Sequence, residues 1–139
     1  MSYVRDIRIE FNHCDPAGIV FFPRYFEMIN SVVENFFRER LHRPFERITM
    51  TEGNGVPTVH LETDFRAPSR LGDLVRFTLT VSGLGRASLD LHHRAAMGGE
   101  LRLEARQRIV WIGRDGRAAP WPDALRARLV REMEKETPK

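Results

Sequence analysis

The hydrophobic positions of this chain follow two periods, and the change from one to the other predicts its elements. From residue 4 to residue 11, apolar and charged residues alternate, which is the pattern of a strand with one buried face. From Pro23 to Arg40, apolar residues recur three and four positions apart, which is the pattern of a helix. Pro23 suits a first helical turn because no N–H is needed there. The apolar stripe is wide, so we expect a larger surface to wrap this helix.

The second half of the chain returns to the two-residue period. Strands are predicted over residues 58–66, 73–84, 87–97 and 101–112. Gly98-Gly99 between the last two is typical of a two-residue hairpin turn. Residues 41–56 are expected to form a loop with a short helical turn, and a final amphipathic helix follows Pro122. This order favours an α+β fold in which one antiparallel sheet of about five strands packs on one long central helix.

Composition indicates a single globular domain over residues 1–139, with 42% hydrophobic and 29% charged residues. No apolar run reaches the ~20 residues of a membrane span, and the N-terminal segment lacks the apolar core of a signal peptide. We therefore expect a cytoplasmic protein without a membrane partner. The single cysteine, Cys14, excludes an internal disulfide and argues against a Cys/His zinc site. The neighbouring His92 and His93 point to opposite faces of a strand, so no metal is expected.

The net charge is +3, the isoelectric point is about 9.6, and almost every cation is an arginine. Arginine suits phosphate-bearing ligands such as a nucleotide or coenzyme A. A Gly- and Arg-rich composition from a high-GC genome explains the same numbers. Because the arginines form no basic tract, nucleic acid is not an expected partner.

The segment from Phe11 to Tyr25 joins the first strand to the long helix and holds the candidate chemistry. A helix N-terminus offers unpaired N–H groups and partial positive charge, which stabilise a carbonyl oxygen that gains negative charge. Asp15 precedes this terminus and could act as base or nucleophile, while Gly18 allows close backbone approach. This pairing suits acyl transfer. A plain turn or capping role for Asp15 fits the same pattern.

The run Asp15-Pro16-Ala17-Gly18-Ile19-Val20, followed by Phe22-Pro23 and Tyr25, resembles the signature of the hotdog-fold acyl-CoA thioesterases. It is most similar to the 4-hydroxybenzoyl-CoA thioesterase family. The likeness extends from about residue 7 to residue 111, with a looser second match over residues 65–73. The resemblance implies a hotdog fold, in which an antiparallel sheet wraps a long helix. It also implies subunits paired edge to edge as a dimer or a dimer of dimers, with active sites at the dimer interface.

The resemblance also implies roles for individual residues. The catalytic carboxylate falls on Asp15, and the backbone N–H that polarises the carbonyl falls on Phe22. Further positions are implied for substrate binding, at Gly18, Tyr25, Pro57 and Thr58, and loosely for coenzyme A binding, at Arg86 and Ser88. His13 is a departure, because many relatives carry an acidic residue there. It could tune Asp15, contact substrate or serve only the structure.

The sequence therefore predicts an acyl-CoA thioesterase that needs no metal or organic cofactor. A non-catalytic hotdog module that binds acyl-CoA is the alternative. A hotdog hydratase is disfavoured, because the Asp and His pair of those enzymes has no match here. Aromatic residues near the helix start suit aromatic and medium-length acyl groups equally, so the acyl group is left open.

Overall fold

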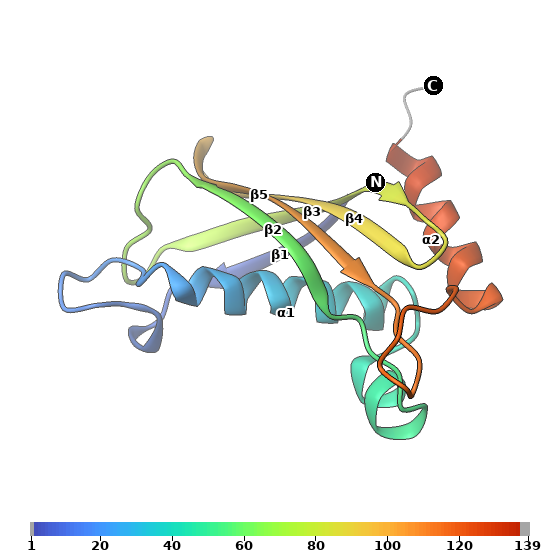
Figure 1. Ribbon diagram of the computed structural model, residues 1–139. Coiled ribbons are helices and arrows are strands. Elements are labelled where there is room, and N and C mark those ends of the chain that lie inside the picture. Colours follow the sequence, from blue (N-terminus) through green and yellow to red (C-terminus); the bar gives the residue numbers. More distant parts are fainter. Residues whose placement is uncertain (1, 137–139) are drawn as a thin grey trace.

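The computed structural model describes residues 2–136 as one curved sheet around one long helix (Figure 1). The elements in chain order are β1 (Tyr3–Arg8), a 3-10 turn (Phe11–His13), α1 (Pro23–Glu39), a π-helical turn (Arg47–Thr51), β2 (Thr58–Phe65), β3 (Leu74–Leu84), β4 (Ser88–Met97), β5 (Glu100–Val110) and α2 (Asp123–Glu136). The strand order is β1-β3-β4-β5-β2, and every neighbouring pair is antiparallel. The predicted α+β architecture is confirmed.

Two local features refine the predictions. The first strand ends at Arg8 instead of residue 11, because the chain turns into the 3-10 helix that leads to the next loop. Gly98 and Gly99 have φ angles of 56° and 84°. Both values are left-handed, as a two-residue hairpin turn requires, so the predicted β4–β5 hairpin is confirmed.

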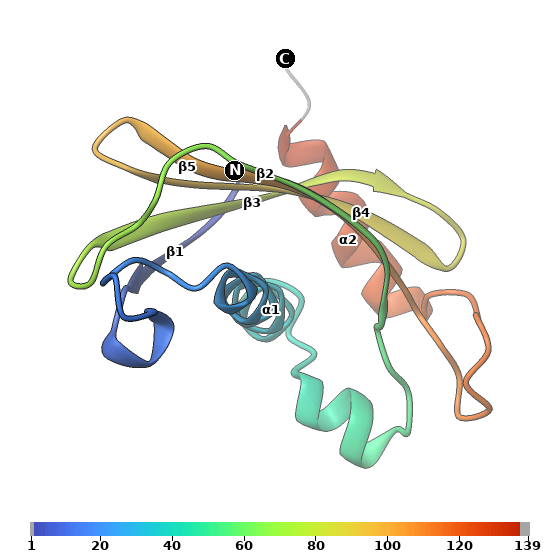
Figure 2. The same ribbon diagram turned by 60° about the vertical axis from the view of Figure 1, so that its left-hand side comes forward.

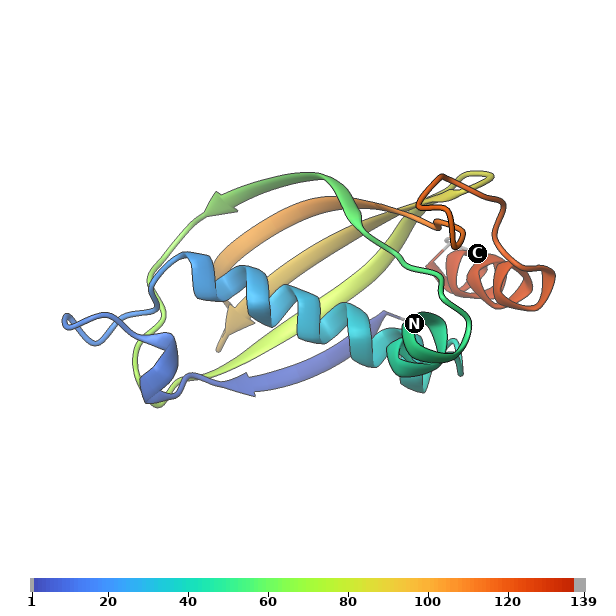
Figure 3. The same ribbon diagram turned by 60° about the horizontal axis from the view of Figure 1, so that its bottom comes forward.

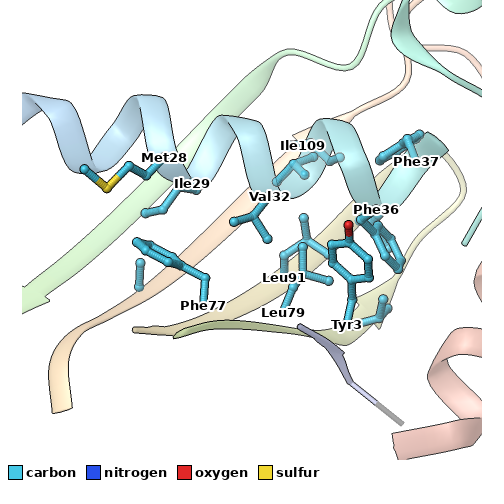
Figure 4. Close-up of a cluster of buried hydrophobic side chains, with 14 of the residues drawn as sticks. Tyr3, Met28, Ile29, Val32, Phe36, Phe37, Phe77, Leu79, Leu91 and Ile109 are labelled. Atoms are coloured by element: carbon cyan, nitrogen blue, oxygen red, sulfur yellow. The ribbon is translucent and has the colours of Figure 1, made fainter. Parts of the chain in front are cut away.

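The apolar stripe of α1 lies against the concave face of the sheet. Figure 2 looks nearly along α1 and shows the sheet curving around it, and Figure 3 shows it crossing the strands. Val32 and Phe37 of α1 are fully buried, and Figure 4 shows Val32 above the sheet residues Phe77 and Leu79. The buried residues of α1 are Tyr25, Met28, Ile29, Val32, Val33, Phe36 and Phe37. Such burial fixes the direction of the helix and of its N-terminus.

The second helix, α2, packs at the end of the sheet that is remote from the start of α1 (Figure 1). Leu125 and Leu129 are buried there, and Glu132 pairs with Arg40 at the end of α1 at 3.0 Å. This end of the molecule is therefore packed, whereas the end near the start of α1 carries an extended loop.

A bulge in β5 buries an arginine beside that loop. The β4–β5 register shifts after Ala95, which leaves Arg102 as an extra residue in β5. The Arg102 guanidinium donates hydrogen bonds to Pro68 O, Ser69 Oγ and Asp73 Oδ2 at 3.1, 3.1 and 2.9 Å. Arg102 is only 6% exposed. It therefore clamps the β2–β3 connection, residues 66–73, onto the sheet.

The clamp changes the electrostatics of Asp73. The hydrogen bond from Arg102, together with the one from the Arg70 N–H, lowers the pKa of the Asp73 carboxyl below its usual value. A carboxyl group whose pKa is lowered by folding stabilises the folded state above its unfolded pKa, and this contribution is lost as the pH falls through the folded pKa.

We expect Arg102→Met to lower the free energy of unfolding by about 3 kcal/mol at pH 7, because it leaves a partly buried carboxylate without its ion pair. The matched control is Arg66→Met, since the half-exposed Arg66 side chain forms only long pairs with Asp64 at 3.7 Å and Glu104 at 4.0 Å and its loss should cost less than about 1 kcal/mol. Urea unfolding measures both variants. The Arg102→Met deficit should shrink as the pH falls below about 4, and a deficit equal to that of Arg66→Met would remove the clamp from the account.

Candidate active site

The loop between β1 and α1 folds as a small hairpin. The Asp15 N–H donates to Ile19 O at 3.0 Å, and the Phe21 N–H donates to His13 O at 2.9 Å. Gly18 has a φ of 76°, a left-handed value that favours glycine, and it provides the reversal. Figures 1 and 3 show that this hairpin projects beyond the N-terminal end of α1. Its tip is therefore accessible in a single subunit.

Backbone hydrogen bonds attach the hairpin to the connection that Arg102 clamps. The Val20 N–H donates to Ser69 O at 2.9 Å, and the Leu71 N–H donates to Gly18 O at 3.0 Å. Ser69 is fully buried and accepts from Arg102 through its hydroxyl. Because Arg102 holds residues 66–73, it also fixes the hairpin that carries Asp15.

The Asp15 carboxylate is oriented by its own turn. Its Oδ1 atom accepts a hydrogen bond from the Ala17 N–H at 2.9 Å, as in an Asx turn. Within residues 2–136, no group donates to the other carboxylate oxygen, and the side chain is half-buried. One oxygen therefore holds the orientation while the other is available to react.

The start of α1 leaves one backbone donor unused. Phe22 is the residue before the helix, and Pro23 has no N–H. The Arg24 N–H donates to Phe21 O at 2.8 Å and the Tyr25 N–H donates to Phe22 O at 3.1 Å, whereas no described residue accepts from the Phe22 N–H. This donor lies at the positive end of a 17-residue helix. Such a group stabilises negative charge on a carbonyl oxygen.

A groove between α1 and β2 begins one helical turn beyond this donor, at Phe26. Its volume is about 340 Å³, and its lining residues are Phe26, Glu27, Ile29, Asn30, Thr58, Leu61 and Gln107. Phe26 is one helical turn beyond Phe22, about 6 Å along the axis. Asp15 lies in the hairpin whose last backbone contact is the Phe21 N–H to His13 O bond, directly before Phe22. The Phe22 N–H is therefore in the same short segment as the carboxylate and one helical turn from the groove residue Phe26.

Tyr25 and the start of β2 border this region. Tyr25 is 4% exposed, and its ring centroid is 5.8 Å from that of Phe65, which also contacts Phe22 at 6.1 Å. Thr58 lines the groove, and Pro57 precedes it. Of the predicted substrate contacts, the structure places Tyr25 near Phe22 through Phe65, whereas Pro57 and Thr58 lie at the other end of β2.

His13 faces elsewhere. Its Nδ1 atom accepts a hydrogen bond from the Glu10 N–H at 2.8 Å. It lines a separate groove of about 440 Å³ on the β1 side of α1, together with Arg8 and Ser31. The structure therefore brings His13 near the base of the hairpin but not into the groove that Thr58 lines.

Arg86, in the turn between β3 and β4, and Ser88, the first residue of β4, lie at the other end of the sheet. Arg86 is exposed, and Ser88 O accepts from the Trp121 Nε1–H at 3.1 Å. The hairpin joins the sheet near the start of β3 (Figure 1), whereas Arg86 follows the end of β3. One subunit alone does not bring these residues to Asp15.

Two buried polar residues, His93 and the groove residue Gln107, were not among the predicted site residues. His93 and Gln107 are 0% and 7% exposed, and His93 Nε2 is 2.8 Å from Gln107 Oε1. Burial lowers the pKa of His93 to about 4, so its ring is neutral at neutral pH. In both strands the other inward-facing positions of the same alternation are apolar. A polar residue at an inward-facing position is therefore the sequence signal that could have identified His93 and Gln107.

Two negative findings apply to residues 2–136. No group of three His, Cys, Asp or Glu side chains lies close enough together there to hold a metal ion. Neither helix in that range has the length and apolar character needed to cross a membrane.

Known proteins with similar sequences and structures identify the family of this chain. A 4-hydroxybenzoyl-CoA thioesterase of Pseudomonas sp. (strain CBS-3) is 30% identical over 103 residues, which cover 71% of this chain and 73% of that protein. A 1,4-dihydroxy-2-naphthoyl-CoA hydrolase of Synechocystis is 28% identical over 118 residues, covering 80% and 85%. The crystal structure of the Pseudomonas enzyme superposes with a TM-score of 0.82 at 26% identity, over 91% of this chain and 98% of that one. Residues 9–129 match the model of the thioesterase-like superfamily, and the chain therefore belongs to this family.

Proposed function

We propose that this chain is an acyl-CoA thioesterase, which hydrolyses a thioester to a free carboxylic acid and coenzyme A. The observation that carries the proposal is the unused Phe22 N–H at the start of α1, in the same short segment as the Asp15 carboxylate. The names of the relatives above, a thioesterase and a CoA hydrolase, support the same reaction.

The Phe22 N–H and the helix dipole polarise the thioester carbonyl and stabilise its oxygen as negative charge develops. Asp15 then either attacks the carbonyl carbon or removes a proton from an attacking water. In both routes the C–S bond breaks and the thiolate leaves, and water supplies the oxygen and the protons of the products. A thiolate is a good leaving group, so the step needs no strong general acid.

Asp15→Asn should lower kcat by at least about 100-fold, because the amide is neither a nucleophile nor a base. Binding of acyl-CoA should persist, since the amide oxygen can still accept from the Ala17 N–H. The matched control is Asp115→Asn, because Asp115 makes the same turn contact with the Arg117 N–H at 3.0 Å in a different loop. A thiol-release assay over short, long and aromatic acyl-CoAs measures both variants. Full activity of Asp15→Asn would exclude Asp15 from the chemistry, and acyl-CoA binding by a wild type that releases no thiol would favour a binding module.

We further propose that the active unit is a homo-oligomer paired through β2. This strand is the last in the sheet order, and its unpaired edge is free to hydrogen-bond another strand. Val59, Leu61 and Phe65 are 58%, 36% and 48% exposed. Apolar exposure along an unpaired edge favours a second copy as the covering surface.

Antiparallel pairing of two β2 strands reverses one sheet relative to the other. The Thr58 end of one β2 then lies next to the Phe65 end of the other. The Phe65 end of each strand is close to the Asp15 hairpin of its own subunit. Arg86 and Ser88 lie at the Thr58 end of their own sheet, where Ser88 pairs with Val110. This arrangement supports coenzyme A binding by Arg86 of the partner subunit and Ser88 of the partner subunit.

Val59→Lys, at a β2 residue outside the groove, should shift the protein toward monomers and lower kcat/KM by at least about 10-fold, because a charge at the paired edge opposes association. Met50→Lys is the matched control, since Met50 is 84% exposed in the turn after α1, outside β2. Sedimentation velocity measures the mass, and thiol release measures activity. A fully active Val59→Lys monomer would contradict the shared site.

A further inference from the structure

A line of hydrogen-bonded polar side chains runs from the buried His93 and Gln107 to the exposed Thr58 in the groove between α1 and β2. His93 Nε2 and Gln107 Oε1 are 2.8 Å apart, and Gln107 Nε2 donates to Thr58 Oγ1 at 2.8 Å. His93 comes from β4, Gln107 from β5 and Thr58 from β2. Gln107 and Thr58 both line the groove between α1 and β2. The two buried polar residues of this line call for an explanation, because apolar residues would pack at their positions at lower cost.

The chain has a fixed direction. A neutral imidazole carries one N–H. Nε2 has an acceptor in Gln107, whereas Nδ1 is buried without a partner among the described residues, so the proton belongs on Nε2. The Gln107 carbonyl therefore accepts from His93 inside the core, and the Gln107 NH₂ group is directed to the groove. The Thr58 oxygen accepts one of these N–H groups, which leaves the Thr58 O–H free to donate.

The groove thus presents donors at a defined point in an apolar setting. Phe26, Ile29 and Leu61 supply the apolar walls. Phe26 and Ile29 are about 6 and 10 Å along α1 from Phe22, so the Gln107 amide faces the part of an acyl group that is distant from its thioester. An oxygen atom there can accept from Gln107 and Thr58. A methyl group there leaves both donors unpaired, at a cost to binding.

We propose that Gln107, oriented by His93, determines acyl specificity by binding an acceptor oxygen at the far end of the acyl group. This inference rests on the proposed thioesterase function and names the residue that selects the acyl group. His93 is a positioning residue, since it contacts Gln107 and not the groove.

The test compares near-isosteric substrates, namely 3- and 4-hydroxybenzoyl-CoA against 3- and 4-methylbenzoyl-CoA, in a thiol-release assay. The wild type should prefer a hydroxyl over a methyl at one of these positions by about 10-fold or more in kcat/KM. In Gln107→Met this ratio should fall below about 3-fold, and in Thr58→Val, which keeps the side-chain shape, it should fall by several fold. The hydroxyl-to-methyl ratio of kcat/KM is insensitive to a general loss of active protein. Thr58→Val changes an exposed residue, so the test remains available if Gln107→Met folds poorly.

Asn30→Met is the matched control, because Asn30 is the other amide of the groove and belongs to α1. Its hydroxyl-to-methyl ratio should equal that of the wild type. Loss of the ratio in Asn30→Met with retention in Gln107→Met would overturn the inference. Equal wild-type turnover of hydroxyl and methyl substrates would also overturn it while leaving the thioesterase function intact. No turnover of any acyl-CoA would contradict the proposed function itself.

Discussion

The packing of α1 inside the curved sheet is the constraint on which the candidate site depends. Seven buried side chains fix the helix along its length, so the N–H of Phe22, just before Pro23, points in one direction. A preorganised donor stabilises developing charge without reorganising at the moment of reaction. The same packing places the first turns of α1 beside Phe65 at the end of β2. The core of the domain and the geometry of the proposed oxyanion site therefore have one physical origin.

The loop that carries Asp15 depends on a second layer of contacts. Arg102 holds the β2–β3 connection, that connection holds the hairpin through Val20 and Gly18, and the hairpin orients the carboxylate. Each step uses charged or backbone hydrogen bonds, because the hairpin projects beyond the hydrophobic core. The tip and the β2 edge are both exposed in one subunit, which is consistent with a site that a second copy completes.

Much of this could be predicted from the alternation of apolar residues, because a wide helical stripe and five two-residue patterns leave few architectures. Asp15 and Phe22 could be identified because both belong to one local motif, which lies between β1 and α1. Arg102 could not be predicted, because a bulge turns it inward out of phase with the alternation of β5. Gln107 and His93 were visible as polar residues at inward positions, but their contact depends on strand register. The groove that His13 faces depends on the path of the 3-10 turn, which the sequence does not specify.

The most direct measurement is a crystal structure of the Asp15→Asn protein with an intact aromatic acyl-CoA bound. Our account predicts the thioester oxygen within about 3.2 Å of the Phe22 nitrogen, with residue 15 next to the acyl carbon and the acyl group in the groove between α1 and β2. A thioester bound with its carbonyl beyond hydrogen-bond distance of Phe22, or with its acyl carbon remote from residue 15, would contradict the account.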